Sequence, residues 1–445
     1  MSRKFICLLG ACLLLLGLGG CSSVPSSSTA AAAHATPVRW LATDHGAVGD
    51  GTTVNTRALQ SAIDELSARG GGTLVVPAGV FLSGALYFKP GVNLLVEKDG
   101  VLKSTTAMAD FPPLYTRWEG IERYWTAAFL NFIGLDHVDV SGAGTIDASG
   151  DAWCDFGRNP RRGLAPFNPA PPASVPSVAV ASPTEIPTTA TASFAPDPAN
   201  LPVINAAGLP LPRMPLSPPR SLVFQNCSHV RVAGLTLKNE ARWGFVFLYC
   251  RDVVAENLTV RAEHYIPSSD GMDVDSCSRV LISGCDIDCN DDCISLKSGK
   301  DEDGRRVNRP CEDVVIEKTR FAYGHGGAAM GSETSGGLRR IEVRDCVAEA
   351  GNWAPIRFKS QPTRGGVVGA AHFPPIVRRV KLIGIHGTAH SAGKIQGLPD
   401  SEIDGIGFQD CAITAQRGLV IEHARHVDTS GLALAVSDGP PITIR

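Results

Sequence analysis

A short strand-like pattern recurs through the C-terminal half of the chain and limits its possible folds more than any other feature. Each copy reads apolar-x-apolar-x-x-(apolar, Cys or Thr)-x-(small or apolar), and this alternation turns one face of a strand toward a core. The copies begin at Val230, Val253, Val280, Val314, Ile341, Val380, Ile406 and Val427. A single copy cannot bury its apolar face alone, so successive copies must stack on one another.

The spacing between copies distinguishes the repeat architectures. It runs 23, 27, 34, 27, 39, 26 and 21 residues, whereas a propeller or sandwich would need units of fixed length. A β-helix keeps its coils constant and varies the loops between them. We therefore predict an all-β fold, a single-stranded right-handed parallel β-helix, which forms one catalytic domain over residues 38–445.

A helix is predicted near the start of this domain, from Val54 to Ala68. Ala58, Ile63 and Leu66 share roughly one face, and the run 70–72 of three glycines ends the helix. Such a short helix would cap the open N-terminal end of the solenoid, where unpaired strand edges promote association. We expect a capped monomer.

The N-terminus carries a targeting signal. Arg3 and Lys4 precede an apolar run that is too short to span a bilayer. The string Leu-Gly-Gly-Cys ending at Cys21 resembles a bacterial lipobox, which predicts a signal peptide over 1–20 and lipidation of Cys21; the alternative is an ordinary signal cut nearby. A Ser/Ala-rich tether follows over 21–37. We expect export to the bacterial periplasm or outer membrane, with membrane contact only through the lipid anchor.

Residues 158–219 interrupt the domain. They contain 16 of the 31 prolines and few strong apolar runs, which predicts a long loop or partly disordered insertion.

Seven of the thirteen cysteines follow the repeat. One position of the repeat is occupied by Cys285, Cys346 and Cys411. The position three residues before a repeat start is occupied by Cys227, Cys250, Cys277 and Cys311. This placement predicts buried thiols in the core, with one or two disulfide bridges. The C-x-x-x-C spacing without paired histidines is a weak zinc signal, so we predict no metal and no cofactor. A net charge of −3 with no basic stripe excludes a nucleic-acid partner.

Polar residues gather after the first strand of four consecutive coils. They are Asp270, Asp291, Asp292, His325, Arg357 and Lys359, with Lys297 directed outward from the strand that follows Asp292. Stacked strands lie about 4.8 Å apart, so four coils bring these groups within roughly 15 Å. Paired carboxylates act as acid and base at a glycosidic bond, and cations bind a sugar carboxylate. The cluster therefore predicts hydrolysis of an acidic polysaccharide.

Each of these residues also has a simpler interpretation. An Asp-Asp pair in a loop is usually a solvated turn, and Arg357 with Lys359 could form an ordinary exposed strand face. The acidic string from Asp286 to Asp292 could bind Ca²⁺, although it lacks the glycine and terminal glutamate of an EF-hand. Recurrence in consecutive coils favours a site.

Four ordered motifs resemble the polygalacturonase family, glycoside hydrolase family 28, whose members are right-handed parallel β-helices. The family signatures Asn-Thr-Asp, Asp-Asp, Gly-His-Gly and Arg-Ile-Lys correspond here to Ser268-Ser269-Asp270, Asp291-Asp292, Gly324-His325-Gly326 and Arg357-Phe358-Lys359. The similarity extends to DHGAVGDGTTVNTRALQSAID, GGGTLVVPAG and GTIDASGDAW, and so covers nearly the whole mature chain except the insertion. Serines replace Asn and Thr in the first motif, and Phe replaces Ile in the fourth.

The resemblance implies roles for the acidic residues. Asp291 would protonate the leaving oxygen, while Asp270 and Asp292 would deprotonate water on the opposite face and invert the anomeric centre. Inverting enzymes place acid and base roughly 6.5–9.5 Å apart, and crowding of the three carboxylates should raise the pKa of the acid.

The same resemblance implies that His325 tunes the acid, and that Arg357 and Lys359 bind a galacturonate carboxylate. The alternation of its strand adds Lys297 as a third predicted substrate-binding cation. The implied substrate is an α-1,4-galacturonosyl linkage of pectin-derived oligogalacturonides. We expect exo action, because an anchored periplasmic enzyme would meet short oligomers. The alternatives are a rhamnogalacturonan or xylogalacturonan hydrolase of the family, a Ca²⁺-dependent pectate lyase, and a non-catalytic carbohydrate-binding β-helix.

Overall fold

The computed structural model describes residues 38–154, 216–360, 364, 367–368, 371–372 and 377–445. The signal peptide over 1–20, the tether over 21–37 with Cys21, and most of the insertion over 158–219 lie outside these residues. Export and lipid anchoring therefore stay predictions. Within the described residues, no helix is long and apolar enough to cross a bilayer.

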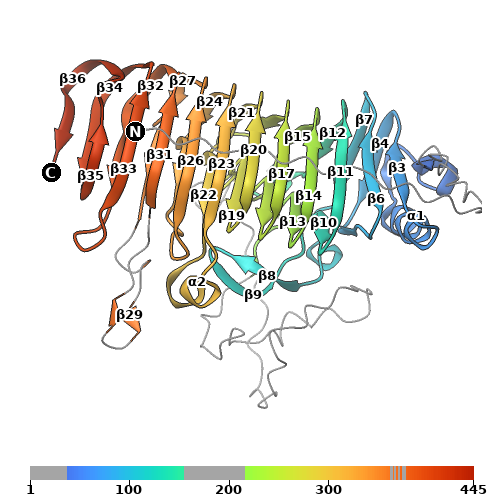
Figure 1. Cartoon of the computed structure of the whole chain (residues 1–445). Coiled ribbons are helices and arrows are strands. Elements are labelled where there is room, and N and C mark those ends of the chain that lie inside the picture. Colours follow the sequence, from blue (N-terminus) through green and yellow to red (C-terminus); the bar gives the residue numbers. More distant parts are fainter. Residues whose placement is uncertain (1–37, 155–215, 361–363, 365–366, 369–370, 373–376) are drawn as a thin grey trace, which may run out of the picture. The chain divides into compact units, whose positions relative to one another are not determined.

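A parallel sheet of twelve strands forms the first ladder of the molecule (Figure 1). Its strands, in order, are β1 (Arg39–Leu41), β3 (Gly72–Val76), β6 (Val92–Val96), β11 (Asp136–Gly142), β14 (Ser228–Ala233), β17 (Arg251–Glu256), β20 (Ser278–Ser283), β23 (Cys311–Glu317), β26 (Leu338–Arg344), β31 (Val377–Ile383), β33 (Ile403–Gln409) and β35 (Ala424–Asp428). The eight predicted repeats are the last eight strands. Their first residues pair in register, as Val230 with Val253 and Val253 with Val280.

Each coil contributes further strands to two more ladders, which merge near the C-terminus. The second ladder contains β2 (Asp50–Val54), β4 (Gly79–Ser83), β7 (Gly100–Ser104), β12 (Thr145–Asp147), β15 (Thr236–Lys238), β18 (Thr259–Arg261), β21 (Asp286–Asp288), β24 (Arg320–Gly324), β27 (Val347–Asn352), β32 (His386–Gln396), β34 (Cys411–Glu422) and β36 (Leu432–Ile444). The third ladder contains β5 (Leu86–Tyr87), β10 (Leu130–Ile133), β13 (Leu222–Gln225), β16 (Phe245–Leu248), β19 (Met272–Asp275), β22 (Asp292–Lys297), β25 (Gly326–Met330) and β28 (Ile356–Phe358), and it joins β32. Stacked parallel coils confirm the predicted β-helix.

The core lies inside the coils and runs along the stack. Inward residues of successive rungs align, so like side chains contact one another. Four phenylalanines of the third ladder region illustrate this, with ring centroids 4.2 Å apart for Phe88 and Phe132, 4.6 Å for Phe132 and Phe224, and 5.2 Å for Phe224 and Phe247. Offset aromatic stacking adds to the free energy gained by burying each ring.

The cysteines of the described residues are all free thiols, and all except Cys154 are buried. Core packing is therefore confirmed, but the expected bridges do not form between described residues. The interior positions are filled by thiols that bond weakly to backbone, as Cys250 Sγ does to the carbonyl of Phe224 at 3.2 Å. Burial raises the pKa of Cys250 well above its ordinary value, which keeps it an uncharged small apolar group.

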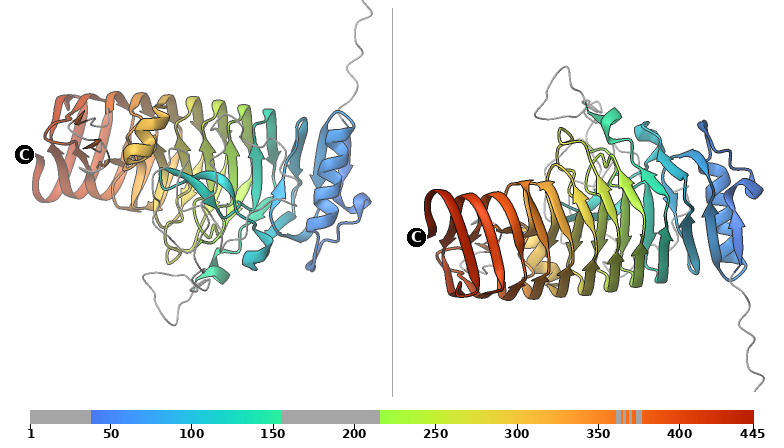
Figure 2. Two further views of the ribbon diagram at one scale, coloured as in Figure 1. Left: turned by 90° about the horizontal axis from the view of Figure 1, so that it is seen from below. Right: turned by 90° about the horizontal axis from the view of Figure 1, so that it is seen from above.

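Helix α1 (Thr56–Ala68) caps the N-terminal end of the stack (Figure 2). It begins two residues later than predicted, because Val54 still belongs to β2. Its buried face consists of Leu59, Ala62, Ile63 and Leu66. The predicted Ala58 is only partly buried, since it lies at the margin of that face.

Several shorter elements complete the described chain. They are the hairpin β8 (Leu114–Trp118) with β9 (Ile121–Trp125), helix α2 (Asp301–Val307), the pair β29 (Val367–Val368) with β30 (Ala371–His372), and the 3₁₀ turns η1 (Ala42–His45), η2 (Met108–Asp110) and η3 (Gly150–Trp153). The hairpin and α2 project from the same side of the stack (Figures 1 and 2). They contact each other, because the Glu122 amide donates to Asp303 Oδ2 at 2.8 Å.

Candidate active site

The polar residues that the sequence singled out lie in, or within two residues of, four consecutive strands of the third ladder, β19, β22, β25 and β28. Met272 pairs with Ile294, so Asp270, two residues earlier, lies opposite Asp292 at the start of β22. Apolar partners such as Ile294 point into the core, which leaves the neighbouring polar side chains on the outer face. The pleat of the ladder thus gathers the predicted residues on one side.

Three carboxylates meet at the centre of this face. One oxygen from each of Asp270, Asp291 and Asp292 lies within 4.8 Å of the others. Asp270 and Asp292 are buried, with 3% and 1% of their surface exposed, while Asp291 is half-buried. The three carboxyl groups lie close together because Asp291 and Asp292 are consecutive and Asp270 lies on the adjacent rung.

Two cations from the next coils converge on Asp292. Arg357 Nη1 lies 3.3 Å from Asp292 Oδ1, and Lys359 Nζ lies 2.6 Å from Oδ2. Gly326 lies between Asp292 and Arg357, and a Cβ added there would come within 2.9 Å of Asp292 Oδ1 and 3.4 Å of the Arg357 Cβ. The second glycine of Gly-His-Gly therefore leaves the space through which the Arg357 side chain reaches the Asp292 carboxylate.

Lys297 forms the floor of the site. Its Nζ lies 2.9 Å from Asp273 Oδ1, 3.6 Å from Asp270 Oδ2 and 3.8 Å from Glu333 Oε2, with the side chain only 6% exposed. The same ammonium lies 4.1 Å from the centre of the Trp243 ring. Lys297 is thus surrounded by protein groups, and its role in substrate binding stays a prediction.

Asp273, Glu333 and Trp243 are residues of this site that the sequence reasoning missed. Asp273 carried a usable signal, since it lies three residues after Asp270 and its polar side chain interrupts a buried strand. Glu333 and Trp243 stand in loops outside the repeat, and only the fold brings them to Lys297.

His325 contacts the most exposed of the three carboxylates. Its Nδ1 lies 3.3 Å from Asp291 Oδ1, and its backbone amide donates to the Asp291 carbonyl at 2.9 Å. Gly324 has a φ of 155°, and a Cβ there would lie 2.7 Å from that carbonyl. Beside it, the Trp353 ring lies 5.3 Å from the imidazole and is 54% exposed, which makes it an open aromatic face next to the site.

The electrostatic environment separates the pKa values of the acids. Burial raises the pKa of Asp270 well above its ordinary value, and the charges of Asp273 and Asp291 raise it further. Burial also favours protonated Asp291, but its contact with His325 and the charge of Lys359 outweigh this and lower its pKa to about 2. The expectation that crowding raises the pKa of Asp291 is therefore wrong for the substrate-free protein, in which a shared proton favours Asp270.

The hairpin β8–β9 forms a wall beside these strands. Arg117 Nη1 bonds Asp275 Oδ1 at 2.7 Å, and both side chains are almost fully buried. Trp118 stacks on Trp243 with ring centroids 5.0 Å apart. The hairpin is therefore connected through Trp243 to Lys297, the floor of the site.

The acidic string considered for Ca²⁺ divides between two places. Asp286 pairs with Arg261 at 2.6 Å and Arg320 at 2.7 Å, and Asp288 lies 2.6 Å from His264. Both are committed to basic partners on the second ladder. Among the described residues, the acidic cluster that could hold a metal at this site consists of Asp270, Asp291 and Asp292 alone.

The arrangement can act on a negatively charged saccharide. It offers a protonated carboxyl group at Asp270, two neighbouring carboxyl groups, and two partly exposed cations on an outer face. Carboxylates in such proximity can exchange a proton with a leaving oxygen and a water, while the cations attract an anionic sugar.

Comparison with known proteins agrees with this chemistry. Residues 215–388, which contain all four motifs, match the model of the glycosyl hydrolases family 28. A probable polygalacturonase of Vitis vinifera is 27% identical over 335 residues, 73% of this chain and 57% of its own length. An exo-poly-alpha-D-galacturonosidase of Dickeya chrysanthemi is 26% identical over 361 residues, 78% of this chain and 56% of its own length. The chain thus spans a little over half the length of these curated relatives.

A solved structure extends the comparison to the whole fold. The hyperthermoactive exopolygalacturonase of Thermotoga maritima superposes with a TM-score of 0.67 and 25% identity, and the match covers 92% of each chain. By its four motifs and its β-helix, the chain is similar to the glycosyl hydrolases of family 28 and is polygalacturonase-like.

Proposed function

We propose that the protein hydrolyses α-1,4-galacturonosyl linkages of pectin-derived oligogalacturonides by acid–base catalysis. The observation that carries the proposal is the convergence of Arg357 and Lys359 on Asp292, next to Asp270 and Asp291. Cations are needed where the substrate is an acid, and carboxylates are needed where a glycosidic bond breaks.

Substrate binding would prepare the acid. A galacturonate carboxylate at Arg357 and Lys359 compensates the positive charges and adds a negative charge near Asp291. Since the charge of Lys359 helps to hold the pKa of Asp291 at about 2, this change raises that pKa. Asp291 then takes over the proton that Asp270 holds in the free protein, and it donates this proton to the leaving oxygen, with His325 at 3.3 Å assisting the transfer. This step leaves Asp270 as a carboxylate.

Water would enter on the opposite side of the sugar. Asp270 and Asp292 lie opposite each other on adjacent rungs, and their carboxylates orient the water and accept its proton. Attack on the face away from the leaving group inverts the anomeric centre. Proton NMR of the first products tests this step. Inversion should give the β-anomer first, whereas retention would give the α-anomer.

Exo action is the mode we favour. It is supported by the printed names of two similar proteins, the exo-poly-alpha-D-galacturonosidase of Dickeya chrysanthemi and the exopolygalacturonase of Thermotoga maritima. It also agrees with the periplasmic location that the N-terminus predicts. No cofactor is assigned to the reaction.

Product analysis on three substrates tests the proposal. Purified protein is incubated with polygalacturonate, oligogalacturonides and rhamnogalacturonan, and the products are separated by anion-exchange chromatography. We expect monomers or dimers from the ends of galacturonides and no products from rhamnogalacturonan. Mid-length fragments appearing early from the polymer would contradict exo action, and turnover of rhamnogalacturonan alone would contradict the substrate.

A further inference from the structure

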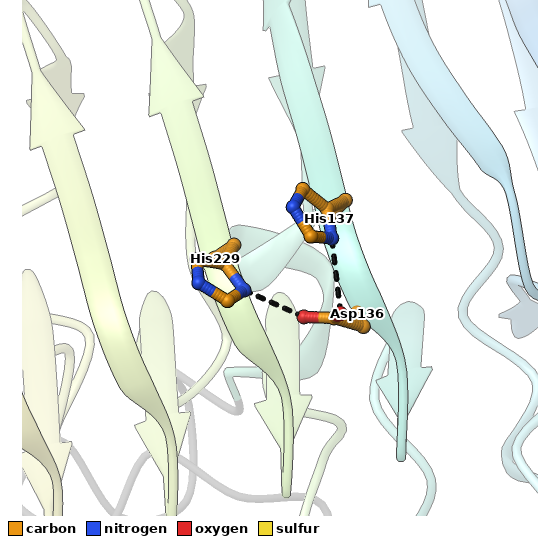
Figure 3. Close-up of side chains that lie close together, drawn as sticks. All are labelled: Asp136, His137 and His229. Atoms are coloured by element: carbon orange, nitrogen blue, oxygen red, sulfur yellow. Dashed lines mark hydrogen bonds and ion pairs between the residues drawn. The ribbon is translucent and has the colours of Figure 1, made fainter. Parts of the chain in front are cut away.

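A cluster of two histidines and one aspartate lies on the first ladder, away from the strands of the candidate active site. Asp136 and His137 belong to β11, and His229 belongs to the next strand, β14 (Figure 3). Their side chains are 56%, 76% and 44% exposed. The proposed hydrolysis uses none of them.

The donor atoms of these three side chains converge. His229 Nδ1 lies 2.7 Å from Asp136 Oδ1, and His137 Nδ1 lies 3.0 Å from Oδ2, so each carboxylate oxygen faces one imidazole (Figure 3). The two rings stack with centroids 4.4 Å apart and planes 18° apart. One donor atom from each residue lies within 4.8 Å of the other two.

The position that His137 and His229 share on the first ladder is occupied by other residue types on the following rungs. On the following two strands, β17 and β20, this position holds Asp252 and Arg279, which pair at 2.6 Å. On the next two strands, β23 and β26, it holds Asp313 and Arg340, which pair at 2.5 Å. Acid–base pairs of this kind satisfy each other. The histidine rungs instead place two like nitrogen donors side by side, with one carboxylate between them.

The backbone and a further carboxylate orient the imidazoles. His137 and His229 have φ values of 56° and 51°, a left-handed conformation that turns both side chains the same way. His229 Nε2 faces Asp252 Oδ2 at 3.8 Å, which leaves Nδ1 for the shared centre. A carboxylate behind a histidine is the usual arrangement around metal-binding imidazoles.

We propose that Asp136, His137 and His229 bind one divalent transition-metal ion such as Zn²⁺. Two imidazole nitrogens and a carboxylate oxygen form a ligand set that zinc prefers, and solvent completes the tetrahedron. Bonds of about 2.0–2.1 Å require donor atoms roughly 3.3 Å apart. Small rotations of these exposed side chains bring atoms within 4.8 Å to that spacing.

Zinc titration by calorimetry tests the site. The mature protein, freed of metal, is compared with the double variant His137→Asn/His229→Asn and with Asp136→Asn. We expect one zinc per chain in the parent, at least about 10-fold weaker binding in Asp136→Asn, and loss of this site in the double variant. Circular dichroism verifies that each variant is folded, and all thiols of the described residues except that of Cys154 are buried.

Two control variants locate the binding. His426→Asn removes a single histidine that faces Asp404 at 2.7 Å on the same ladder, and Asp291→Asn changes the acidic cluster of the candidate active site. Both should bind zinc as the parent does. Equal zinc binding by the parent and the double variant, or loss of binding in Asp291→Asn alone, would overturn the proposal.

Electron paramagnetic resonance of bound Cu²⁺ gives an independent readout. Coupling to two nitrogen nuclei is expected in the parent and in His426→Asn, because both imidazoles then coordinate. A spectrum with no nitrogen coupling in the parent would contradict the assigned ligands, even if zinc bound elsewhere.

Discussion

At the residue scale, Lys359 acts on two carboxyl groups of the site. It pairs with Asp292 at 2.6 Å and lowers the pKa of Asp291 by its charge. The sequence identified both partners, because the motif residues recur in consecutive coils. It could not identify the pairing of Arg357 and Lys359 with Asp292, since these residues lie two rungs apart and only the stacking of the coils brings them together.

Replacing Lys359 by Met should weaken catalysis through loss of the sugar carboxylate contact. A hydrogen bond between charged groups contributes about 1.5–3 kcal/mol, so kcat/KM should fall about 10- to 100-fold. Steady-state kinetics on an oligogalacturonide measure this. The exposed Lys381 on the first ladder provides the control, and Lys381→Met should leave kcat/KM unchanged; an equal loss in both variants would contradict the assignment.

A second residue-scale prediction concerns Glu240, which is fully buried. Neither of its carboxylate oxygens has a hydrogen-bond partner among the described residues, and burial raises its pKa well above the ordinary value. The folded state therefore holds a proton that the unfolded state loses above about pH 4.3, and stability falls by about 1.4 kcal/mol per pH unit until the folded pKa is reached.

Glu240→Gln removes this titration. The variant should match the parent in acid and become the more stable of the two as pH rises through that window, with the difference read from urea unfolding midpoints. Parallel stability curves for parent and variant across that pH window would show that Glu240 is ionised in the folded protein.

At the scale of elements, the ladder register determines both core and site. The sequence predicted eight of the twelve strands of the first ladder, because their apolar alternation is regular. The four N-terminal strands were missed as repeats, since β1, β3 and β6 are short and irregularly spaced. The hairpin β8–β9 has no signal in the repeat, and only the fold shows that it packs beside the site.

The stack of phenylalanines gives a prediction at this scale. Phe224 is fully buried and lies between Phe132 and Phe247, so truncation leaves a cavity on both sides. Phe224→Ala should destabilise the fold by about 3–5 kcal/mol, measured by urea unfolding. Val347→Ala, at a 48% exposed strand position, should change stability by less than about 0.5 kcal/mol; similar losses in both would contradict a continuous core.

At the scale of the whole molecule, the cap and the stack share one continuous hydrophobic core. Helix α1 buries Leu66 completely at the N-terminal end, where open strand edges would otherwise pair with other chains. The sequence predicted this helix from its apolar face and the following glycines. Its first turn was misplaced because Val54 is equally compatible with the end of a strand.

Disrupting the cap should change the oligomeric state. Leu66→Asp places a charge in the buried face, so we expect dimers or larger assemblies by size-exclusion chromatography with light scattering, while the parent runs as a monomer. Glu65→Ala, on the exposed side of the same helix, should also remain a monomer. A monomeric, folded Leu66→Asp variant would show that the cap does not prevent association.

We propose that the carboxylate cluster hydrolyses a bond between acidic sugars. The most direct measurement is turnover of trigalacturonate in heavy-oxygen water, followed by mass spectrometry, for the parent and for Asp291→Asn. We predict one labelled oxygen at each new reducing end in the parent, no unsaturated product, and at least about a 100-fold slower reaction in the folded variant. Unlabelled, ultraviolet-absorbing products would reveal elimination, and unchanged turnover in Asp291→Asn would contradict its role as the acid.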